Sequence, residues 1–344
     1  PILEQSDFAQ KLVMVVGALT SLFAATVEIT QDDIKKIIAY STCSQLGYMF
    51  FAAGVGAYNV AMFHLFTHAF FKALLFLGSG SVIHAFKDEQ NINNMGGVWK
   101  KLPYTYALMI VGTLALTGFP LLSGFYSKDA IIEFAYLSGT TSGYYAAGIG
   151  IITAFLTSIY SWRLIFKTFH GPYNNKEIRI EETHESPLVM LLPLLILSIG
   201  AIFAGFIFKE LFIGSEGINN FWRESIFFLE PLSTDHPPLW FLTLTPTLVM
   251  LSIPLAYYLF VKDKNFSAQI VNINKPLYEF LFNKWYFDEI YDILFVKSSK
   301  KFGLFLWKFL DTKVIDGFGP DGISGLIQKF SIKAKKFQSG YIYQ

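Results

Sequence analysis

Three titratable side chains recur at helical spacing inside one long apolar run. His64, His68 and Lys72 lie four residues apart in the run 60–86. A helix turns by about 100° per residue, so this spacing puts them on one slowly drifting stripe, each roughly 6 Å from the next. Because a charged side chain in hydrocarbon costs at least a few kcal/mol, the stripe requires a polar interior lined by protein. The spacing predicts a relay for protons.

Lys72 is the central residue of this predicted relay. A desolvated lysine can load and unload a proton near neutral pH, and a nearby charge or a chain of waters can switch it. The alternative is a lysine whose ammonium group snorkels to the membrane surface. Lys72 is about 12 residues from either end of its run, close to the middle of a bilayer, which favours the interior position.

The two histidines allow three interpretations. As neutral or cationic groups, His64 and His68 extend the path from Lys72 toward one side of the membrane. Alternatively, they are hydrogen-bonded interior histidines, or ligands of a metal or haem at i, i+4 spacing. A metal needs further ligands, and the only other His, Cys or carboxylate in the run is His84, which falls on roughly the opposite face. The relay is therefore favoured.

A second pair of ionisable residues follows an interruption rich in glycine and proline. Lys128 and Asp129 are adjacent, so on a helix they point about 100° apart, which favours partners elsewhere over a mutual ion pair. They either take part in proton transfer beside a broken span, with Glu133 as a weaker candidate, or have a structural role. In the structural interpretation Ser127 caps a helix that restarts there, and Asp129 in its first turn interacts with the helix dipole.

These residues belong to a chain that is too apolar for an ordinary soluble protein. Of its 344 residues 53% are hydrophobic and 15% are charged, and the mean hydropathy is +0.43, which is typical of a polytopic helical membrane protein. The basic residues lie singly or in pairs beside apolar spans, so we expect no nucleic-acid partner. Cys43 is the only cysteine, which excludes an intramolecular disulfide and a multi-cysteine metal site, and we expect it to be a packing residue.

Seven apolar runs of spanning length must position the ionisable residues. They are 12–28, 37–57, 60–86, 103–122, 144–169, 187–208 and 239–261. The run 37–57 carries a polar stripe at helical spacing, which either holds water or hydrogen-bonds a neighbouring helix. The stripe consists of Ser41, Ser44, Gln45 and Tyr48.

The stretch 102–138 decides the topology. If it crosses the membrane once, ten lysines and arginines of the loops lie on one side and three on the other, whereas two crossings remove this asymmetry. One crossing is therefore favoured. A straight helix of this length would be about 55 Å long against roughly 30 Å of hydrocarbon, so the span must be broken near Gly118, Pro120 and Gly124.

The C-terminal part has a different character. The stretch 274–310 is dense in Phe, Tyr and Trp with interspersed charges, and it has no uncharged run long enough to span. A helix of this kind lies along a membrane interface or against neighbouring helices. The stretch 316–322 interrupts it. If mostly helical, 275–340 would reach about 100 Å, which suggests a lateral tie between neighbouring proteins.

Three segments resemble the antiporter-like subunits of respiratory complex I, which are related to the large subunits of multi-subunit sodium/proton antiporters. They are Asp33–Tyr48 (DIKKIIAYSTCSQLGY), Phe63–Leu77 (FHLFTHAFFKALLFL) and Gly124–Asp129 (GFYSKD). The segment Lys284–Val296 (KWYFDEIYDILFV) and the long interfacial helix are similar to the family members that end in a lateral helix.

The resemblance implies an all-α polytopic helical bundle. Residues 1–170 would form the second antiporter-like five-helix repeat, with a broken helix, and 171–262 would add two transmembrane helices and a long external loop. Residues 263–344 would form an amphipathic lateral helix region on the cytoplasmic side. Because the chain begins at Pro1 and stops where we expect the closing helix to begin, we expect a C-terminal fragment of the subunit.

The resemblance also implies roles for single residues. Lys72 would be the central lysine of the path, with His64 and His68 beside it. Lys128 would be the terminal proton-loading site, and Asp129 would be the carboxylate that modulates it.

The function implied is proton translocation in the membrane arm of NADH:quinone oxidoreductase, in the bacterial inner membrane. The chain has no nucleotide loop, flavin fingerprint or cluster ligands, so we expect NADH, quinone, FMN and iron–sulfur clusters in partner subunits and no cofactor on this chain. The expected partners are other antiporter-like and membrane-arm subunits of complex I and the lipid bilayer. Two alternatives stay open, namely a subunit of a multi-subunit sodium/proton antiporter and a structural membrane scaffold.

Overall fold

The computed structural model describes residues 3–176, 178–214, 217–223, 225–226, 237–337 and 340. Over these residues the regular structure is helical, and extended backbone pairs only in an isolated bridge between Asp33 and Asn91. The chain divides into two compact units, Pro1–Trp285 and Tyr286–Gln344, which are described one after the other. The helical fold class predicted from the sequence is confirmed.

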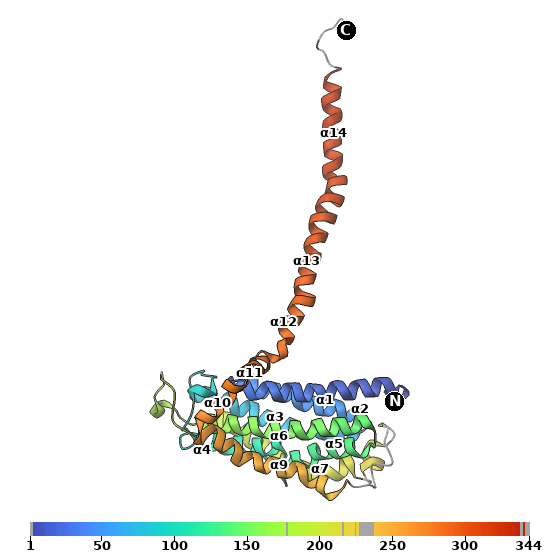
Figure 1. Ribbon diagram of the computed structural model, residues 1–344. Coiled ribbons are helices and arrows are strands. Elements are labelled where there is room, and N and C mark those ends of the chain that lie inside the picture. Colours follow the sequence, from blue (N-terminus) through green and yellow to red (C-terminus); the bar gives the residue numbers. More distant parts are fainter. Residues whose placement is uncertain are drawn as a thin grey trace. The chain divides into compact units, whose positions relative to one another are not determined.

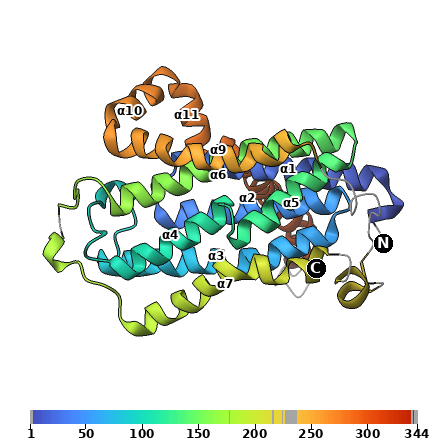
Figure 2. The ribbon, with the colours of Figure 1, turned by 90° about the horizontal axis from the view of Figure 1, so that it is seen from below.

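The first unit is a bundle of helices that run alongside one another (Figures 1 and 2). Its α-helices are α1 (Asp7–Thr30), α2 (Ile34–Gly54), α3 (Tyr58–Ala85), α4 (Pro103–Thr117), α5 (Ser123–Leu137), α6 (Thr141–Phe169), α7 (Leu188–Ile213), α9 (Leu239–Tyr257), α10 (Lys264–Ile273) and α11 (Lys275–Phe282). Shorter turns are η1 (Leu3–Gln5), η2 (Ile92–Asn94), η3 (Ile180–Glu182), η4 (Ile218–Trp222), η6 (Tyr258–Lys262) and η7 (Lys284–Tyr286), the last at the junction of the two units.

Five helices are long and apolar enough to cross a membrane. They are α1, α3, α6, α7 and α9 continued by η6. The predicted runs 37–57 and 103–122 correspond to α2 and α4, which are not among these five helices. Although α2 has 21 residues, its inward-facing polar stripe makes it less apolar, and α4 has only 15 residues because the run 103–122 is interrupted at Gly118.

The predicted break in the stretch 102–138 is confirmed. Helix α4 ends at Thr117, Gly118 takes a left-handed conformation with φ 79°, and α5 begins at Ser123. The chain just before α4 lies at the C-terminal end of α6, where the Trp99 amide donates to the Phe169 carbonyl at 3.3 Å. Since α5 ends beside the start of α6, α4 and α5 together run between the two ends of α6 as one broken crossing (Figure 2).

Gly124 lets the first turn of α5 approach the last turn of α4. A Cβ atom at this position would lie 1.8 Å from the carbonyl oxygen of Ala115, far inside van der Waals contact. The sequence predicted Gly124 as part of the break, whereas the structure puts it inside α5 and confines the break to residues 118–122.

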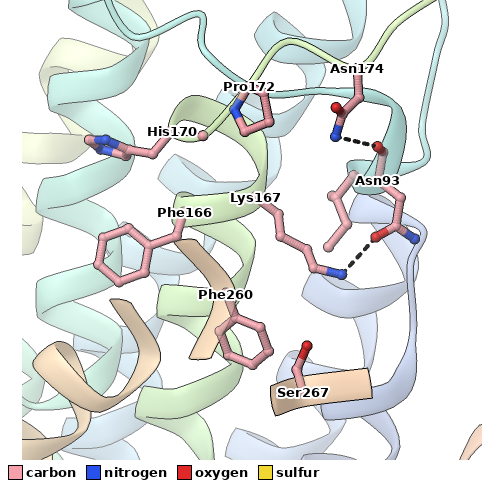
Figure 3. Close-up of a pocket in the computed structure, with 10 residues that line it drawn as sticks. Asn93, Phe166, Lys167, His170, Pro172, Asn174, Phe260 and Ser267 are labelled. Carbon is pink, nitrogen blue, oxygen red and sulfur yellow. Dashed lines mark hydrogen bonds between the residues drawn. The ribbon is translucent and has the colours of Figure 1, made fainter. Parts of the chain in front are cut away.

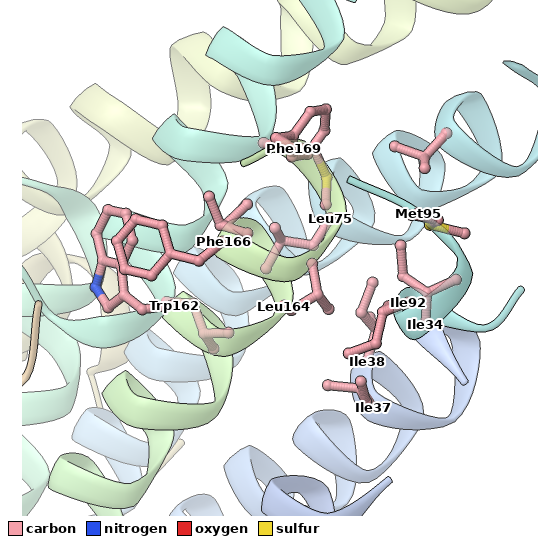
Figure 4. Packing of buried hydrophobic residues seen from close by; sticks show 14 of the residues in the cluster. Ile34, Ile37, Ile38, Leu75, Ile92, Met95, Trp162, Leu164, Phe166 and Phe169 are labelled. Atoms are coloured by element: carbon pink, nitrogen blue, oxygen red, sulfur yellow. The ribbon is translucent and has the colours of Figure 1, made fainter. Parts of the chain in front are cut away.

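Apolar side chains of α2, α3, α4 and α6 form the larger core of the bundle (Figure 4). Ile37, Leu75 and Ile165 are buried there, and Ile92 and Met95 of the loop after α3 extend the core to the end of the bundle. Lipid is as apolar as these side chains, so van der Waals packing rather than exclusion of water holds such helices together.

Charged residues gather at this same end of the bundle. The guanidinium group of Arg163 lies 2.5 Å from Asp32 and also donates to the Gln31 carbonyl at 2.5 Å. At the surface the Lys87 ammonium bonds to Glu182 at 2.5 Å, which holds the pKa of that carboxyl below its ordinary value. The ends of α1, α3 and α6 therefore lie together, as the single-crossing topology requires.

The stretch 274–310 is not one helix, and the prediction of a continuous interfacial helix is wrong at this point. Lys284, Trp285 and Tyr286 have φ values of 55°, 56° and 55°, and such left-handed residues cannot continue a right-handed helix. Helix α11 therefore ends at Phe282. Within the first unit, the Trp285 ring packs edge-on against Phe23 of α1 at 5.3 Å between centroids.

The second unit is helical over most of its described residues, up to Lys335. The chain is helical through α12 (Phe287–Tyr291), η8 (Asp292–Lys297), α13 (Ser298–Phe305) and η9 (Leu306–Asp316), and α14 (Pro320–Lys335) follows. The predicted interruption at 316–322 is confirmed at Gly319. Large apolar side chains such as Phe302 and Trp307 are exposed.

Candidate functional site

Lys72 lies in the middle of α3 and inside the bundle. Its side chain is 4% exposed, and its Nζ has no hydrogen bond of ordinary geometry to the described residues. It lines a small cavity with Ser41 of α2, Thr113 of α4 and Tyr160 of α6. The cavity volume is about 10 Å³, which is close to the space that one water molecule needs. The ammonium group of Lys72 is therefore enclosed by four helices.

His64 and His68 occupy the same interior. The centroids of their rings are 6.0 Å apart, and both side chains are buried. Nε2 of His64 lies 3.2 Å from Oε1 of Gln45, and Nδ1 lies 2.9 Å from the hydroxyl of Ser127. With the Gln45 amide in this orientation, Nε2 carries the proton and Nδ1 accepts from Ser127.

Ser127 connects α3 to α5. Its hydroxyl bonds to Thr67 at 2.7 Å as well as to His64, and it also lies 3.3 Å from the carbonyl of Ser123. The prediction that Ser127 caps α5 is wrong, because the helix begins at Ser123, one turn earlier. For the same reason Asp129 does not lie in the first turn.

Lys128 and Asp129 are buried side by side on α5. Lys128 is fully buried, and its Nζ lies 5.2 Å from the ring centroid of Tyr48, a cation–π contact. Over the residues that the structure describes, neither Nζ of Lys128 nor Oδ1 of Asp129 has a hydrogen bond, and the ion pairs found there do not include one between these two residues. The divergent directions predicted for adjacent helical residues agree with this arrangement.

The polar stripe of α2 bonds to three different helices. Ser41 bonds to Tyr160 of α6 at 2.8 Å, Ser44 donates to the Ser21 carbonyl of α1 at 2.9 Å, and Gln45 faces His64 of α3. Tyr48 donates to the Gly150 carbonyl of α6 at 2.5 Å. Of the two interpretations of this stripe, hydrogen bonding to neighbouring helices is the one that these contacts support.

Glu28 is a buried ionisable residue that the sequence reasoning missed. It lies in α1 with 0% of its side chain exposed. The sequence contains a signal for Glu28, because the predicted apolar run 12–28 ends on this carboxylate. A titratable side chain in an apolar run is also what identified His64 as a candidate. Arg163, within the run 144–169, was missed in the same way. Cys43, expected as a packing residue, is exposed on α2.

A second, larger cavity lies at the C-terminal end of α6 (Figure 3). Its volume is about 260 Å³, and Lys167 beside it donates to Oδ1 of Asn93 at 2.6 Å. His170 also lines it, and Nε2 of this histidine lies 2.8 Å from the hydroxyl of Tyr106. Burial lowers the pKa of His170 below its ordinary value. The sequence pattern indicates no role for His170.

Metal ligation receives no support from the described part of the chain. Within those residues, no group of three or more His, Cys, Asp or Glu side chains could hold a metal ion. Both ring nitrogens of His64 face Gln45 and Ser127 instead.

The fold and these buried groups together define the class of protein. It is a multi-pass helical membrane protein in which a broken helix lies beside ionisable side chains, an arrangement that transporters use for ion sites. A family model described as "NADH:quinone oxidoreductase/Mrp antiporter, TM" matches residues 1–161, which include α1 to α5 and most of α6.

The curated relatives are similar over the whole chain. "NADH-ubiquinone oxidoreductase chain 5" of Marchantia polymorpha is 43% identical, and the alignment covers 100% of this chain and 52% of the relative. "NADH-quinone oxidoreductase subunit L" of Rhodobacter capsulatus is 40% identical, with coverage of 100% and 57%. The whole chain is therefore similar to antiporter-like complex I subunits, as the sequence motifs indicated. It spans about half the length of the curated relatives it matches.

Two solved structures share the fold. An archaeal membrane-bound sulfane sulfur reductase, a respiratory membrane complex, is 26% identical with a TM-score of 0.53, over 58% of this chain and 32% of that one. A chain of the Mrp complex from Dietzia sp. DQ12-45-1b is 18% identical with a TM-score of 0.53, over 69% and 49%. At this identity the second likeness concerns the fold alone.

Proposed function

We propose that the chain is a proton-translocating membrane-arm subunit of an NADH:quinone oxidoreductase. Quinone reduction in partner subunits would drive protons along Lys72, His68, His64 and Lys128, with Asp129 beside the last lysine. One observation carries the proposal. The contact between His64 and Ser127 brings the histidine stripe of α3 to the residue that precedes Lys128, which supports a single line of proton-carrying groups that includes both lysines.

Each group on this line has chemistry suited to the task. An imidazole can accept a proton on one ring nitrogen and release a proton from the other, so His68 and His64, by changing protonation state or tautomer, can carry protons between Lys72 and the Ser127 side. The hydroxyl of Ser127 lies between His64 and the segment that carries Lys128. Two ammonium groups repel each other, so a proton arriving on one lysine favours the release of a proton from the other.

The redox chemistry would belong to partner subunits. An iron–sulfur cluster needs several cysteine ligands, and this chain contains only Cys43. We therefore assign NADH, FMN, quinone and the clusters to partners, and we propose other antiporter-like and membrane-arm subunits as those neighbours. The names of the bacterial and mitochondrial relatives support this assignment.

We retain the division of the chain at 170 and 262 as part of the proposal. Residues 1–170 would be the antiporter-like repeat, 171–262 would contribute α7 and α9, and 263–344 would lie along the cytoplasmic membrane surface beside neighbouring subunits. The exposed apolar and lysine side chains of the last region support an interfacial position. We place the complex in the bacterial inner membrane. The similarity to the Rhodobacter capsulatus protein supports this assignment.

Replacement of Lys72 tests the proposal. In the assembled complex in proteoliposomes, Lys72→Met should reduce proton translocation about a hundredfold or more, because removal of a proton-transfer group typically costs 10²- to 10⁴-fold. Lys101→Met, which removes an exposed lysine at the end of the bundle, is the matched control and should translocate normally. Normal assembly and normal translocation in Lys72→Met would favour the scaffold and overturn the proposal.

A sodium/proton antiporter subunit is the second candidate, because the matching family model includes Mrp antiporters. Such a protein would use much the same buried residues. The proteins that co-purify with this chain distinguish the two candidate functions, since an NADH:quinone oxidoreductase subunit should co-purify with flavin and iron–sulfur subunits. An antiporter subunit should instead support sodium-driven proton movement without NADH.

A further inference from the structure

A buried carboxyl group lies on the other side of Lys72 from the histidines. Glu28 is 0% exposed near the C-terminal end of α1, and among the described residues neither of its carboxylate oxygens has a hydrogen bond of ordinary geometry. An unpaired carboxylate is costly to bury, so a purely structural carboxyl would be expected to have firm hydrogen bonds. Glu28 therefore needs another explanation.

The surroundings of Glu28 link it to Lys72. The hydroxyl of Tyr160 faces the carboxyl group, and this hydroxyl bonds to Ser41 at 2.8 Å. Ser41, Tyr160 and Lys72 line the same cavity of about 10 Å³, which has space for about one water molecule. Two hydroxyl groups and this cavity thus lie between the carboxyl and the ammonium group.

The charged and titratable groups around Glu28 come from four helices. Lys72 of α3, Tyr160 of α6, Cys43 of α2 and Lys128 of α5 interact with it electrostatically. Helix α11 also packs on α1, but its Tyr278 interacts with Asp32 and Arg163 instead. Among these charges, that of Lys72 has the largest electrostatic effect on the carboxyl group of Glu28.

Glu28 lies toward the basic end of the bundle. The C-terminal ends of α1 and α3 are tied together there, because the Ile92 amide donates to the Asp32 carbonyl at 2.9 Å. Glu28 is one turn before Asp32, and the exposed Lys35 and Lys36 follow at the start of α2. His64 precedes Lys72 by two turns on α3 and so lies away from this end. The order from the basic end is therefore Glu28, Lys72 and then the histidines.

We propose that Glu28 is a proton-exchanging residue that supplies Lys72 from the basic end of the bundle through Tyr160 and Ser41. The inference rests on the proposed function. In each transfer the protonated carboxyl gives its proton to the Tyr160 hydroxyl while that hydroxyl passes its own proton to Ser41. Ser41 releases its own proton to water in the cavity, and that water gives one proton to the neutral amine of Lys72. The starting state returns when the carboxylate of Glu28 takes a proton from the aqueous side, Lys72 passes its proton on toward His68, and the two hydroxyl groups rotate back.

Glu28→Gln in the assembled complex tests this assignment. It keeps the shape of the side chain and removes its proton, so we expect normal assembly and about tenfold slower proton translocation. The pH profile should change as well, with the rate falling more steeply as the pH rises, because Lys72 would then depend on protons taken directly from solution. Glu28→Asp keeps a carboxyl group and should recover part of the rate.

Glu210→Gln is the matched control. Glu210 also lies in the last turns of a long apolar helix, α7, but it is exposed, so the same substitution should leave the rate and pH profile unchanged. Equal effects of the two substitutions would overturn the assignment. If Glu28→Gln does not assemble, Tyr160→Phe interrupts the same route, and a normal translocation rate in that variant would also overturn it.

The Lys72→Met variant separates this inference from the proposed function. Slow translocation in Lys72→Met together with a normal rate and profile in Glu28→Gln would remove Glu28 from the path and leave the proposed function intact. Normal translocation in Lys72→Met would remove the proposed function itself.

Discussion

The hydroxyl of Ser127 lies 2.9 Å from Nδ1 of His64, and this contact joins the interior faces of α3 and α5. Thr67, one turn after His64 on α3, bonds to the same hydroxyl at 2.7 Å. The ring of Tyr48 links His64 to the second buried lysine, because it lies 6.5 Å from the His64 ring and 5.2 Å from Nζ of Lys128. The two helices thus present one polar interior although the residues that form it are about 60 positions apart.

Ser127→Ala should slow proton translocation. The substitution removes the hydroxyl that connects His64 to α5. We expect a loss of about tenfold, which is less than the loss of a proton-transfer group itself typically causes, because water can partly replace a hydroxyl. The measurement is the initial rate of acidification of proteoliposomes that contain the whole complex. Quinone reduction with an uncoupler present reports whether the complex is intact.

Ser123→Ala is the control for this substitution. Ser123 is also buried on α5, one turn earlier, and its hydroxyl has no hydrogen-bond partner among the described residues. We expect a rate close to that of the wild type. An equal loss in both variants would show that packing of α5, and not the contact with His64, is responsible.

Gly124→Ala should destabilise the broken crossing. The new Cβ atom would lie 1.8 Å from the Ala115 carbonyl oxygen, so the backbones of α4 and α5 would have to separate by more than 1 Å. Overpacking of this kind typically costs about 1–3 kcal/mol. A lower thermal unfolding temperature of the detergent-solubilised complex is the expected result.

Gly148→Ala provides the comparison. Gly148 lies in α6 with open space where its Cβ would be, and alanine is the better helix former by about 1 kcal/mol. This variant should be as stable as the wild type or more so. A Gly124→Ala variant of unchanged stability would mean that the close approach of α4 and α5 does not constrain residue 124.

Much of the helical architecture could be predicted from the sequence because apolar runs and their interruptions are local signals. The run 60–86 predicted α3. The position of Lys72 near the middle of that run predicted that its side chain lies in the interior. The glycines and proline of 118–124 predicted the break. The exact start of α5 could not be predicted, since the helix begins at Ser123 after Leu122 without a side-chain cap, and the contact with α3 that uses Ser127 arises only when the helices pack.

Contacts between helices account for most of what the sequence did not reveal. Glu28 ends an apolar run and resembles an interfacial charge, and only the packing of α2 and α6 against α1 buries it. The partners of His64 are 19 and 63 residues away, so no spacing rule could find them. The left-handed residues 284–286 include no glycine or proline, and the sequence therefore gave no local signal for the end of α11.

Acidification should loosen the loop at the C-terminal end of α6. Burial holds the pKa of His170 below its ordinary value of 6.5. The unfolded imidazole takes up a proton as the pH falls through about 6.5, whereas the folded one resists protonation until the pH is lower. The stability contributed by neutral His170 is therefore complete above pH 6.5 and is lost as the pH falls through its folded pKa.

Hydrogen exchange at two amides measures this effect. The amides of Gly97 and Trp99 donate to the carbonyls of His170 and Phe169 at 3.4 and 3.3 Å, so their protection reports whether the loop is closed. Corrected for the intrinsic rate, their exchange should be faster at pH 5.5 than at pH 7.5. His170→Gln should abolish this difference, because glutamine does not titrate, whereas replacement of the exposed His184 by glutamine should preserve it. A pH dependence that survives in His170→Gln would assign the change to another group.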